Sequence, residues 1–374
     1  MNIEQLNKLF HNYIARFDEI SFGKNDETYK WEIVQKFQDE FNLSAPDFSS
    51  MLRNLWSASE NLIDNSTQLP FFALVDYAQH EPDTVRQMFA DLYTDDGGDL
   101  TVRQNKIEHF ISKTEELRHK YKPDSWRYVN DQRSVMSYLF LYDPDHNYLY
   151  KSTQAHEFAD CVEFYDDIGY GSDFKLPVYY RMCDELVKEM QSCDELLTVH
   201  KTRFDGKRKL YPDNQLHILS FDMIYSSQVY GLYNGIEYTH LSSAERRQYR
   251  EREAKAVELF TVYQAAQDDM EKLDEVKAYL AKQLHIGDTI HHKSFHEGIV
   301  ESFENGYVSI KFSEQIGVKR FEAISALAGG FIMPQTLEFS EYIKVHSQIM
   351  KSANSLPNRL KRAEADLEPY REYL

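Results

Sequence analysis

The hydrophobic positions in the first third of the chain recur with the period of a helix. Across residues 1–122, apolar side chains return at every third or fourth position, as Ile33, Val34 and Phe37 do. A run of Asp and Gly at 95–99 interrupts this pattern and has the residue types that end one helix and cap the next. The pattern predicts a region built mainly from helices that pack their apolar faces together.

The middle of the chain has a different pattern. Residues 135–142 and 147–151 are rich in Tyr and Leu and flank an Asp-Pro-Asp-His turn, which predicts a β-hairpin over Ser134–Tyr150. Residues 176–199 return to a helical pattern. The apolar run at 216–225 is typical of a buried segment, and both a strand and a helix fit it.

The last third combines long helical patterns with a region that has the period of β-strands. Residues 243–283 contain no Pro or Gly and predict one long helix. Residues 284–333 alternate between apolar and polar around an Asn-Gly turn, which predicts a small β-barrel. Residues 334–374 end in an apolar seam with heptad spacing, so we expect them to pair with 243–283 as an antiparallel hairpin.

The predicted fold class is therefore α+β and mainly helical. A large helical N-terminal domain (1–235) would contain the small β-hairpin. The long helix (243–283) and the C-terminal helical region (334–374) would together carry the β-barrel (284–333) at the tip of their hairpin.

The charge is distributed unevenly along the chain. The net charge is −19 at pH 7, and most of it falls on residues 1–242 because the remainder is nearly balanced. Such a surface repels phosphate backbones unless cations are concentrated locally. No apolar run approaches the roughly eighteen residues that a membrane helix needs, and the first residues lack the layout of a signal peptide. The three cysteines are too few for a disulfide framework or a zinc site, so we expect a cytoplasmic protein without membrane contact.

One basic cluster stands out within the acidic part of the chain. Five cations lie close together in the sequence around one aromatic residue. The cations could bind phosphate groups while the aromatic ring stacks on a base. The alternative is an exposed loop whose cations balance acidic neighbours. The candidate binding residues in this cluster are Lys201, Arg203, Phe204, Lys207, Arg208 and Lys209.

A second cluster contains groups that could serve acid–base or metal chemistry. Asp143, Asp145, His146, His156 and Glu157 lie close together in the sequence. Turn chemistry explains the first three equally well, because Asp-Pro-Asp is a common turn composition. We therefore assign no catalytic residue and expect neither a metal ion nor a cofactor.

Four aromatic-rich stretches occur in a recognisable order, at 27–32 (Glu-Thr-Tyr-Lys-Trp-Glu), 83–93, 142–151 and 211–213 (Tyr-Pro-Asp). Through them the chain resembles the N-terminal region of bacterial McrB-type restriction ATPases, which are AAA+ motor proteins. In that family the region precedes the motor and is associated with target recognition or assembly. The motif G-x-x-x-x-G-K-[ST] of the motor does not occur in this chain, so the resemblance implies recognition or scaffolding without nucleotide hydrolysis.

The predicted barrel has a resemblance of its own. The residues that carry this resemblance are Gly287, Ile290-His291, Phe295-His296-Glu297-Gly298, 308–312 and Lys319-Arg320-Phe321. They resemble the SH3/Tudor-like barrel at the C-terminus of UvrD/PcrA-type helicases, although Phe295-His296 replaces the family's Phe-Gly. This resemblance implies a docking module for RNA polymerase or nucleic acid.

The docking surface of the barrel has named candidates. Phe295 and Tyr307 could also form an aromatic cage for a methylated amine, although packing in the barrel core explains them equally. Adjacent His291 and His292 point to opposite faces of a strand, which argues against a shared metal ion. The candidate partner-binding residues of the barrel are His291, Lys293, Phe295, Tyr307, Lys311, Lys319 and Arg320.

The sequence thus favours a non-enzymatic recognition or adaptor protein in a nucleic-acid process, such as bacterial defence against foreign DNA. The expected partner is a protein, namely a motor ATPase, a nuclease or a polymerase, with nucleic acid as a second ligand. Two alternatives stay open. One is a metal-dependent nuclease whose acidic residues converge only in the fold, and the other is an acidic inhibitor or assembly factor.

Overall fold

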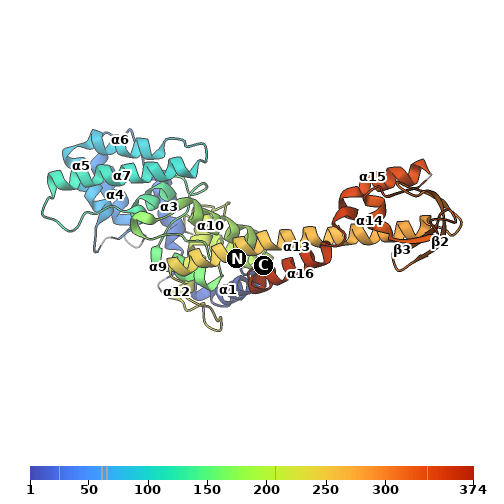
Figure 1. Ribbon diagram of the computed structural model, residues 1–374. Coiled ribbons are helices and arrows are strands. Elements are labelled where there is room, and N and C mark those ends of the chain that lie inside the picture. The colour runs from blue at the N-terminus through green and yellow to red at the C-terminus, as the bar shows by residue number, and fades with distance from the viewer. Residues whose placement is uncertain (25, 60–61, 65, 207, 335) are drawn as a thin grey trace. The chain divides into compact units, whose positions relative to one another are not determined.

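The chain folds into two compact units, Met1–Arg247 and Gln248–Leu374. The computed structural model of the 374 residues describes residues 1–24, 26–59, 62–64, 66–206, 208–334 and 336–374 (Figure 1). Within these residues the first unit is helical, and all strands belong to the second unit. The mainly helical α+β class with a small sheet is therefore confirmed.

The first unit consists of short helices wrapped around one hydrophobic core. Neighbours in sequence pack on one another, since α4 contacts α5, α5 contacts α6, and α6 contacts α7 (Figure 1). The helices are α1 (Ile3–Ala15), α2 (Phe17–Phe22), α3 (Tyr29–Glu40), α4 (Phe48–Ala58), α5 (Pro70–His80), α6 (Pro82–Tyr93), α7 (Leu100–Tyr121), α8 (Gln132–Tyr142), α9 (Ser152–Cys161), α10 (Leu176–Gln191), α11 (Asp194–Thr202) and α12 (His217–Val229), with 3₁₀ turns η1 (Gly171–Asp173) and η2 (Arg203–Asp205).

Short acidic side chains fix where several of these helices begin. The Asp99 carboxylate accepts hydrogen bonds from the first backbone N–H groups of α7, at Thr101 (2.8 Å) and Val102 (3.2 Å). Such N-caps satisfy donors that the helix itself cannot, and each contributes about 1 kcal/mol. The predicted turn and cap at 95–99 are therefore confirmed.

The β-hairpin predicted over Ser134–Tyr150 is wrong, because residues 132–142 form helix α8. Every residue from Ser134 to Leu141 is buried, so the segment has no polar face that would reveal the period of a helix. A capping box starts the helix: Asp131 accepts from the Ser134 backbone, and the Ser134 hydroxyl accepts from the Asp131 backbone. The ambiguous run at 216–225 is likewise helical and lies in α12.

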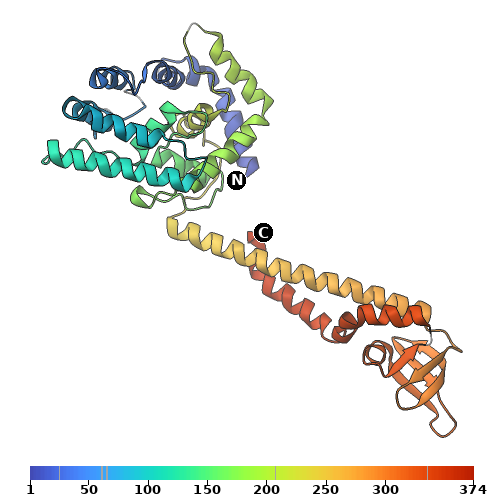
Figure 2. The same cartoon turned by 90° about the horizontal axis from the view of Figure 1, so that it is seen from above.

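The second unit contains most of helix α13 (Ser243–Gln283) and an antiparallel sheet. Figure 2 shows α16 running beside α13. The sheet is five-stranded with the order β4-β3-β2-β1-β5. Its elements are β1 (Thr289–His292), β2 (His296–Glu304), β3 (Tyr307–Lys311), β4 (Val318–Glu322), α14 (Ala323–Ala328) and β5 (Ile332–Pro334), followed by α15 (Leu337–Ser352), α16 (Leu356–Leu367) and the 3₁₀ turn η3 (Glu368–Tyr373).

The sheet follows the predicted alternation. Val308 and Ile310 are fully buried, whereas Tyr307 and Lys311 on the same strand are exposed. The turn between β2 and β3 is made by Asn305 and Gly306, which both have positive φ (51° and 78°), the conformation that an Asn-Gly hairpin turn requires.

Contacts along α13 hold α15 and α16 against it. Leu273, Val276 and Leu280 of α13 share one core cluster with Met350 and Leu356. An ion pair joins α16 to α13 beyond this core, between Arg359 and Asp269 at 2.8 Å.

Candidate functional site

The basic cluster at 201–209 does not form a free cationic surface. Arg208 contacts the carboxylates of Asp26 (2.7 Å) and Glu32 (2.6 Å), and Lys209 contacts that of Asp39 (2.5 Å). Two of the candidate cations therefore balance acidic side chains of the same unit. This is the arrangement that the exposed-loop alternative predicts.

The other members of the cluster are placed differently from one another. Lys201 is exposed and has no ion-pair partner among the described residues. Phe204 is half-buried, with its ring edge-on to His200 at 5.2 Å, so its face is not free to stack on a base. Lys207 lies outside the described residues.

Arg203 was expected on an exposed loop, and the structure corrects this because the residue is only 2% exposed. Its guanidinium lies 3.8 Å from the centre of the Trp31 ring and donates to the Ser21 hydroxyl (2.7 Å) and the Tyr13 hydroxyl (3.0 Å). The sequence of the segment, in which basic residues predominate, gave no sign that Arg203 is buried. Arg203 cannot contact phosphate from this position.

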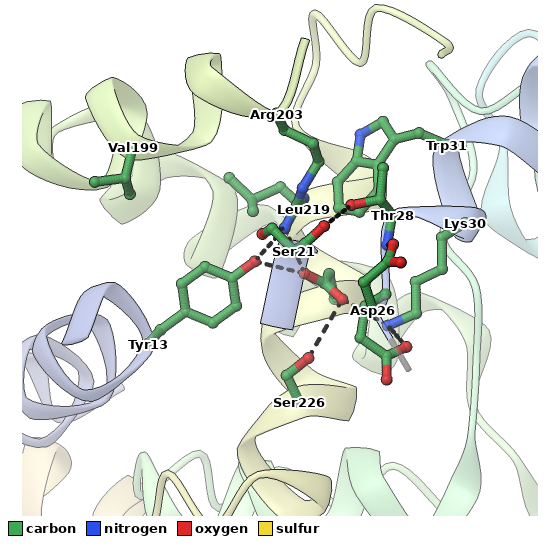
Figure 3. Close-up of polar contacts among 12 residues, drawn as sticks. Tyr13, Ser21, Asp26, Thr28, Lys30, Trp31, Val199, Arg203, Leu219 and Ser226 are labelled. Carbon is green, nitrogen blue, oxygen red and sulfur yellow. Dashed lines mark hydrogen bonds and ion pairs between the residues drawn. The ribbon is translucent and has the colours of Figure 1, made fainter. Parts of the chain in front are cut away.

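Arg203 belongs to a buried polar network centred on Asp222 of α12, which is 0% exposed. The Asp222 carboxylate accepts from the Tyr13 hydroxyl (2.5 Å) and the Lys30 ammonium (2.6 Å), and it pairs with Arg203 at 3.3 Å. Figure 3 shows Tyr13, Lys30 and Arg203 converging from α1, α3 and η2. The network ties together segments that are distant in the sequence.

The cations of this network decide its charge state. Burial raises the pKa of the Asp222 carboxyl, but the neighbouring charges of Lys30 and Arg203 outweigh burial, and its pKa is lowered. Lys30 contacts a second carboxylate, that of Glu27, at 3.1 Å. Among the described residues Arg203 Nη2 donates within the unit, whereas Arg203 Nε and Nη1 have no hydrogen-bond partner. Because the Asp222 carboxylate and its cations bind one another inside the unit, we assign the network to the fold and not to a ligand.

A second buried carboxyl lies next to this network. Asp213 accepts from the Trp31 indole N–H (3.2 Å) and from the backbone N–H groups of Ile218 (3.0 Å) and Leu219 (2.9 Å). Burial raises the pKa of Asp213 to about 7, against the effect of these donors. The carboxyl caps α12 at its first turn, which is again a structural role.

The acidic and histidine side chains considered for catalysis have separate partners. Asp143 contacts His146 at 2.9 Å, as expected for a turn. Glu157 accepts from Gln228 (2.7 Å) and belongs to α9. His156 stacks on the Tyr170 ring, with 3.8 Å between the ring centres. In the part of the chain that the structure describes, no group of three or more His, Cys, Asp and Glu side chains is placed to hold a metal ion.

The outer face of the sheet carries most of the partner-binding candidates of the second unit. On β3 and β4, Lys311 lies opposite Val318, and Ser309 lies opposite Arg320. The Arg320 guanidinium covers the Tyr307 ring at 4.4 Å from its centre, a cation–π contact that holds both side chains on this face.

Exposed apolar side chains continue this face across the strands. Ile299 on β2 pairs with Lys311 and is 53% exposed, and Val318 is 51% exposed. His291 on β1 lies opposite the exposed Met333 of β5. We call Ile299, Tyr307, Lys311, Val318 and Arg320 the outer sheet face.

The remaining barrel candidates lie elsewhere. Phe295 stacks on His292 (4.4 Å between centres) and contacts the buried Phe312 (5.3 Å), so it belongs to the core side of the sheet. It cannot form a cage with Tyr307, which lies on the outer face. Lys293 is exposed in the turn before β2, and Lys319 is exposed on β4, opposite the buried Ile310.

The sequence did not reveal the central residues of the buried Asp222 network or of the outer sheet face. Asp222 lay in the run at 216–225, which was left open between strand and helix, and Tyr13 lay in the region expected to be helical; only the position of Lys30 between aromatic residues hinted at a buried cation. Ile299 and Val318 were assigned to strands but not to a surface. For Ile299 the signal was its alternation with the buried Gly298 and Val300, whereas β4 has no such alternation around Val318.

No protein-family model matches this sequence, and no curated protein or solved structure is detectably similar to the chain. Among the described helices, none combines the length and apolar character needed to cross a membrane.

Proposed function

We propose that this chain is a non-enzymatic adaptor that docks a protein partner through the outer sheet face. The observation that carries the proposal is the composition of that face. Ile299 and Val318 are more than half exposed, and they lie beside the cation–π pair of Arg320 and Tyr307. Exposed apolar groups with Tyr and Arg at their edge are typical of protein interfaces.

The proposal extends the function expected from the sequence. The antiparallel sheet with an Asn-Gly turn supports an SH3/Tudor-like barrel, the docking module of the resemblance noted above. The McrB-like stretches support a setting in a nucleic-acid process, such as restriction-type defence. A motor ATPase, a nuclease or a polymerase is the class of partner that this setting implies.

A protein fits the outer sheet face better than a duplex does. The face carries Lys311 and Arg320, but Glu297, Glu301 and Glu304 are exposed along β2, so cations do not dominate it. A duplex partner requires a strongly positive patch because phosphate contacts supply most of the affinity. Apolar side chains flanked by charges of both signs suit a protein surface.

The proposal can be tested with a pair of matched variants of the full chain. Ile299→Ser with Val318→Ser removes the apolar part of the face without touching the core. Val345→Ser is the control, since Val345 is 76% exposed on α15 and equally apolar. Proteins captured by rapid crosslinking in the native cell are quantified for each variant. We expect the double variant to lose at least about tenfold of one specific partner, which corresponds to about 1.4 kcal/mol of binding. Equal capture by all variants would refute docking through this face.

One alternative function is favoured by a separate observation, the net charge of −19. A strongly acidic chain can act as an inhibitor or assembly factor that binds a basic protein through its acidic surface. Binding of that kind weakens steeply with added salt and is unaffected by Ile299→Ser with Val318→Ser. The two functions are therefore distinguished by the same variants.

A further inference from the structure

An aromatic row crosses the surface of the first unit where α4, α5 and the segment between α7 and α8 meet. The Trp56 ring of α4 lies 4.9 Å from the Phe72 ring of α5, measured between centres. Phe72 in turn stacks on Tyr128, with 6.3 Å between the centres and 29° between the planes. All three rings are partly exposed.

Cationic side chains line the same rings. Arg53 lies 5.7 Å from the centre of Phe72, and Lys122 lies 5.5 Å from that of Tyr128. Trp126, two positions before Tyr128 in the chain, adds a fourth ring, and Arg127 covers it at 5.0 Å. We call the set the aromatic–cation row; its members are Arg53, Trp56, Phe72, Lys122, Trp126, Arg127 and Tyr128.

Trp126 is the most unusual member because it is 62% exposed. The backbone on both sides of it is held in place: Arg118 donates to the Ser125 carbonyl (2.6 Å), and the Tyr128 N–H donates to the Gln68 carbonyl (2.6 Å). Tyr128 also has a φ of 68°, a left-handed conformation that costs a bulky residue free energy. A fixed segment thus presents a large apolar ring to solvent.

The charge of the row contrasts with the acidity of the chain. Of the acidic side chains near it, Asp76 is held by Lys122 (3.1 Å) and Asp131 by Arg133 (2.6 Å), while Asp124 is exposed. Arg53 and Arg127 have no ion-pair partner among the described residues. Among the described side chains, the two unpaired cations outnumber the one unpaired carboxylate, so this surface carries a small positive excess on an otherwise acidic protein, which favours the approach of a phosphate.

We propose that the aromatic–cation row binds unpaired nucleotides of a single-stranded nucleic acid. Trp126 provides a stacking face for a base, Arg127 beside it neutralises an adjacent phosphate, and Arg53 beside Phe72 neutralises another. Stacking on an aromatic side chain contributes about 1–3 kcal/mol per base and tolerates any sequence, because every base has a π-face. Paired bases in a duplex are already stacked on their neighbours and cannot reach the Trp126 ring.

This site is separate from the outer sheet face and does not depend on the proposed docking function. It lies in the first unit, whereas the docking face lies in the second. Together they would give one chain a contact with nucleic acid and a contact with a protein, but either can fail alone.

The test titrates a labelled oligothymidylate of about fifteen nucleotides with the full chain at low salt and measures the fluorescence anisotropy. A probe of about that length is long enough for such sites. Trp126→Ala is expected to weaken binding by about 5-fold to 150-fold, the range that 1–3 kcal/mol implies. Trp126→Phe keeps a stacking ring and should restore most of the affinity. Arg127→Gln should weaken binding and also reduce its dependence on salt.

Controls separate this proposal from its rivals. Phe22→Ala removes another exposed aromatic ring of the first unit (54% exposed) and should leave binding unchanged. Ile299→Ser with Val318→Ser should also bind the oligonucleotide normally; weakened binding there would place the ligand on the sheet and overturn the proposal. Equal affinity for a blunt-ended duplex without a loop, no binding at low salt, or unchanged binding by Trp126→Ala would each overturn it as well. Binding of the wild-type chain to anionic vesicles but not to the oligonucleotide would assign the row to a membrane surface instead.

Discussion

Replacing Asp222 with Asn should destabilise the first unit more than any change on its surface. The carboxylate is fully buried and contacts two cations, Lys30 at 2.6 Å and Arg203 at 3.3 Å. The amide keeps the shape but leaves those cations without their shared counter-charge. Removing one partner of a buried ion pair costs about 3–5 kcal/mol, which is a large part of the roughly 5–15 kcal/mol that stabilises a typical domain.

Tryptophan fluorescence during urea unfolding measures this loss directly. The chain has three tryptophans, Trp31, Trp56 and Trp126, and all of them belong to the first unit. The fluorescence midpoint therefore reports that unit even in the full chain. Adding Lys30→Met to Asp222→Asn should recover little of the stability, because Lys30 still pairs with Glu27 in the single variant.

A nearby surface change provides the control for this prediction. Asp205→Asn removes an exposed carboxylate from the turn that also carries Arg203, and it should leave the midpoint unchanged. If Asp222→Asn lowered the free energy of unfolding by less than about 1 kcal/mol, the reasoning would be refuted, because removing one partner of a buried ion pair should cost about 3–5 kcal/mol.

Three further outcomes follow from single contacts. In Gly298→Ala, the new methyl group would lie 2.6 Å from Ile310 and 2.7 Å from Phe312, so circular dichroism should show the second unit losing about 1–3 kcal/mol while tryptophan fluorescence is unchanged. Burial lowers the pKa of His200 to about 3, whereas the unfolded chain binds a proton at this histidine below about pH 6.5. The free energy of unfolding therefore decreases as the pH falls below about 6.5. His200→Leu should reduce this dependence on pH by up to about 1.4 kcal/mol per pH unit. Lys209→Gln should leave oligonucleotide affinity unchanged in the anisotropy assay, because the Lys209 ammonium already contacts the Asp39 carboxylate. A clear loss of affinity would show that the 201–209 segment takes part in binding.

The sequence predicted elements whose two sides differ in polarity. Strand β3 alternates between buried and exposed residues, and α13 is rich in charged residues and contains no Pro or Gly, so both patterns are visible in the chain itself. Helix α8 was mistaken for strands because burial on all sides removes that contrast. The capping box of Asp131 and Ser134 was the local signal that favoured a helix.

The candidate sites were harder to predict because they depend on contacts between distant residues. Arg208 is neutralised by Asp26, which lies 182 positions away, and Arg203 turns inward towards Asp222. A cluster of cations in a sequence shows how many charges are present but not where their side chains point. The aromatic–cation row was missed for the same reason, since Trp56 and Tyr128 are brought together only by the packing of α4, α5 and the segment after α7.

The proposed setting in a nucleic-acid process and the proposed aromatic–cation row share one claim, that the chain recognises nucleic acid without altering it. A single gel with labelled single-stranded and duplex DNA and RNA, run with the full chain in Mg²⁺ or Mn²⁺, tests it most directly. The account predicts a slower band with the single strands, from which the strands are recovered at full length after denaturation. Shortened strands that are lost in Asp143→Ala or Glu157→Ala would contradict it in favour of a nuclease. Intact strands with no shifted band would contradict the recognition of nucleic acid itself.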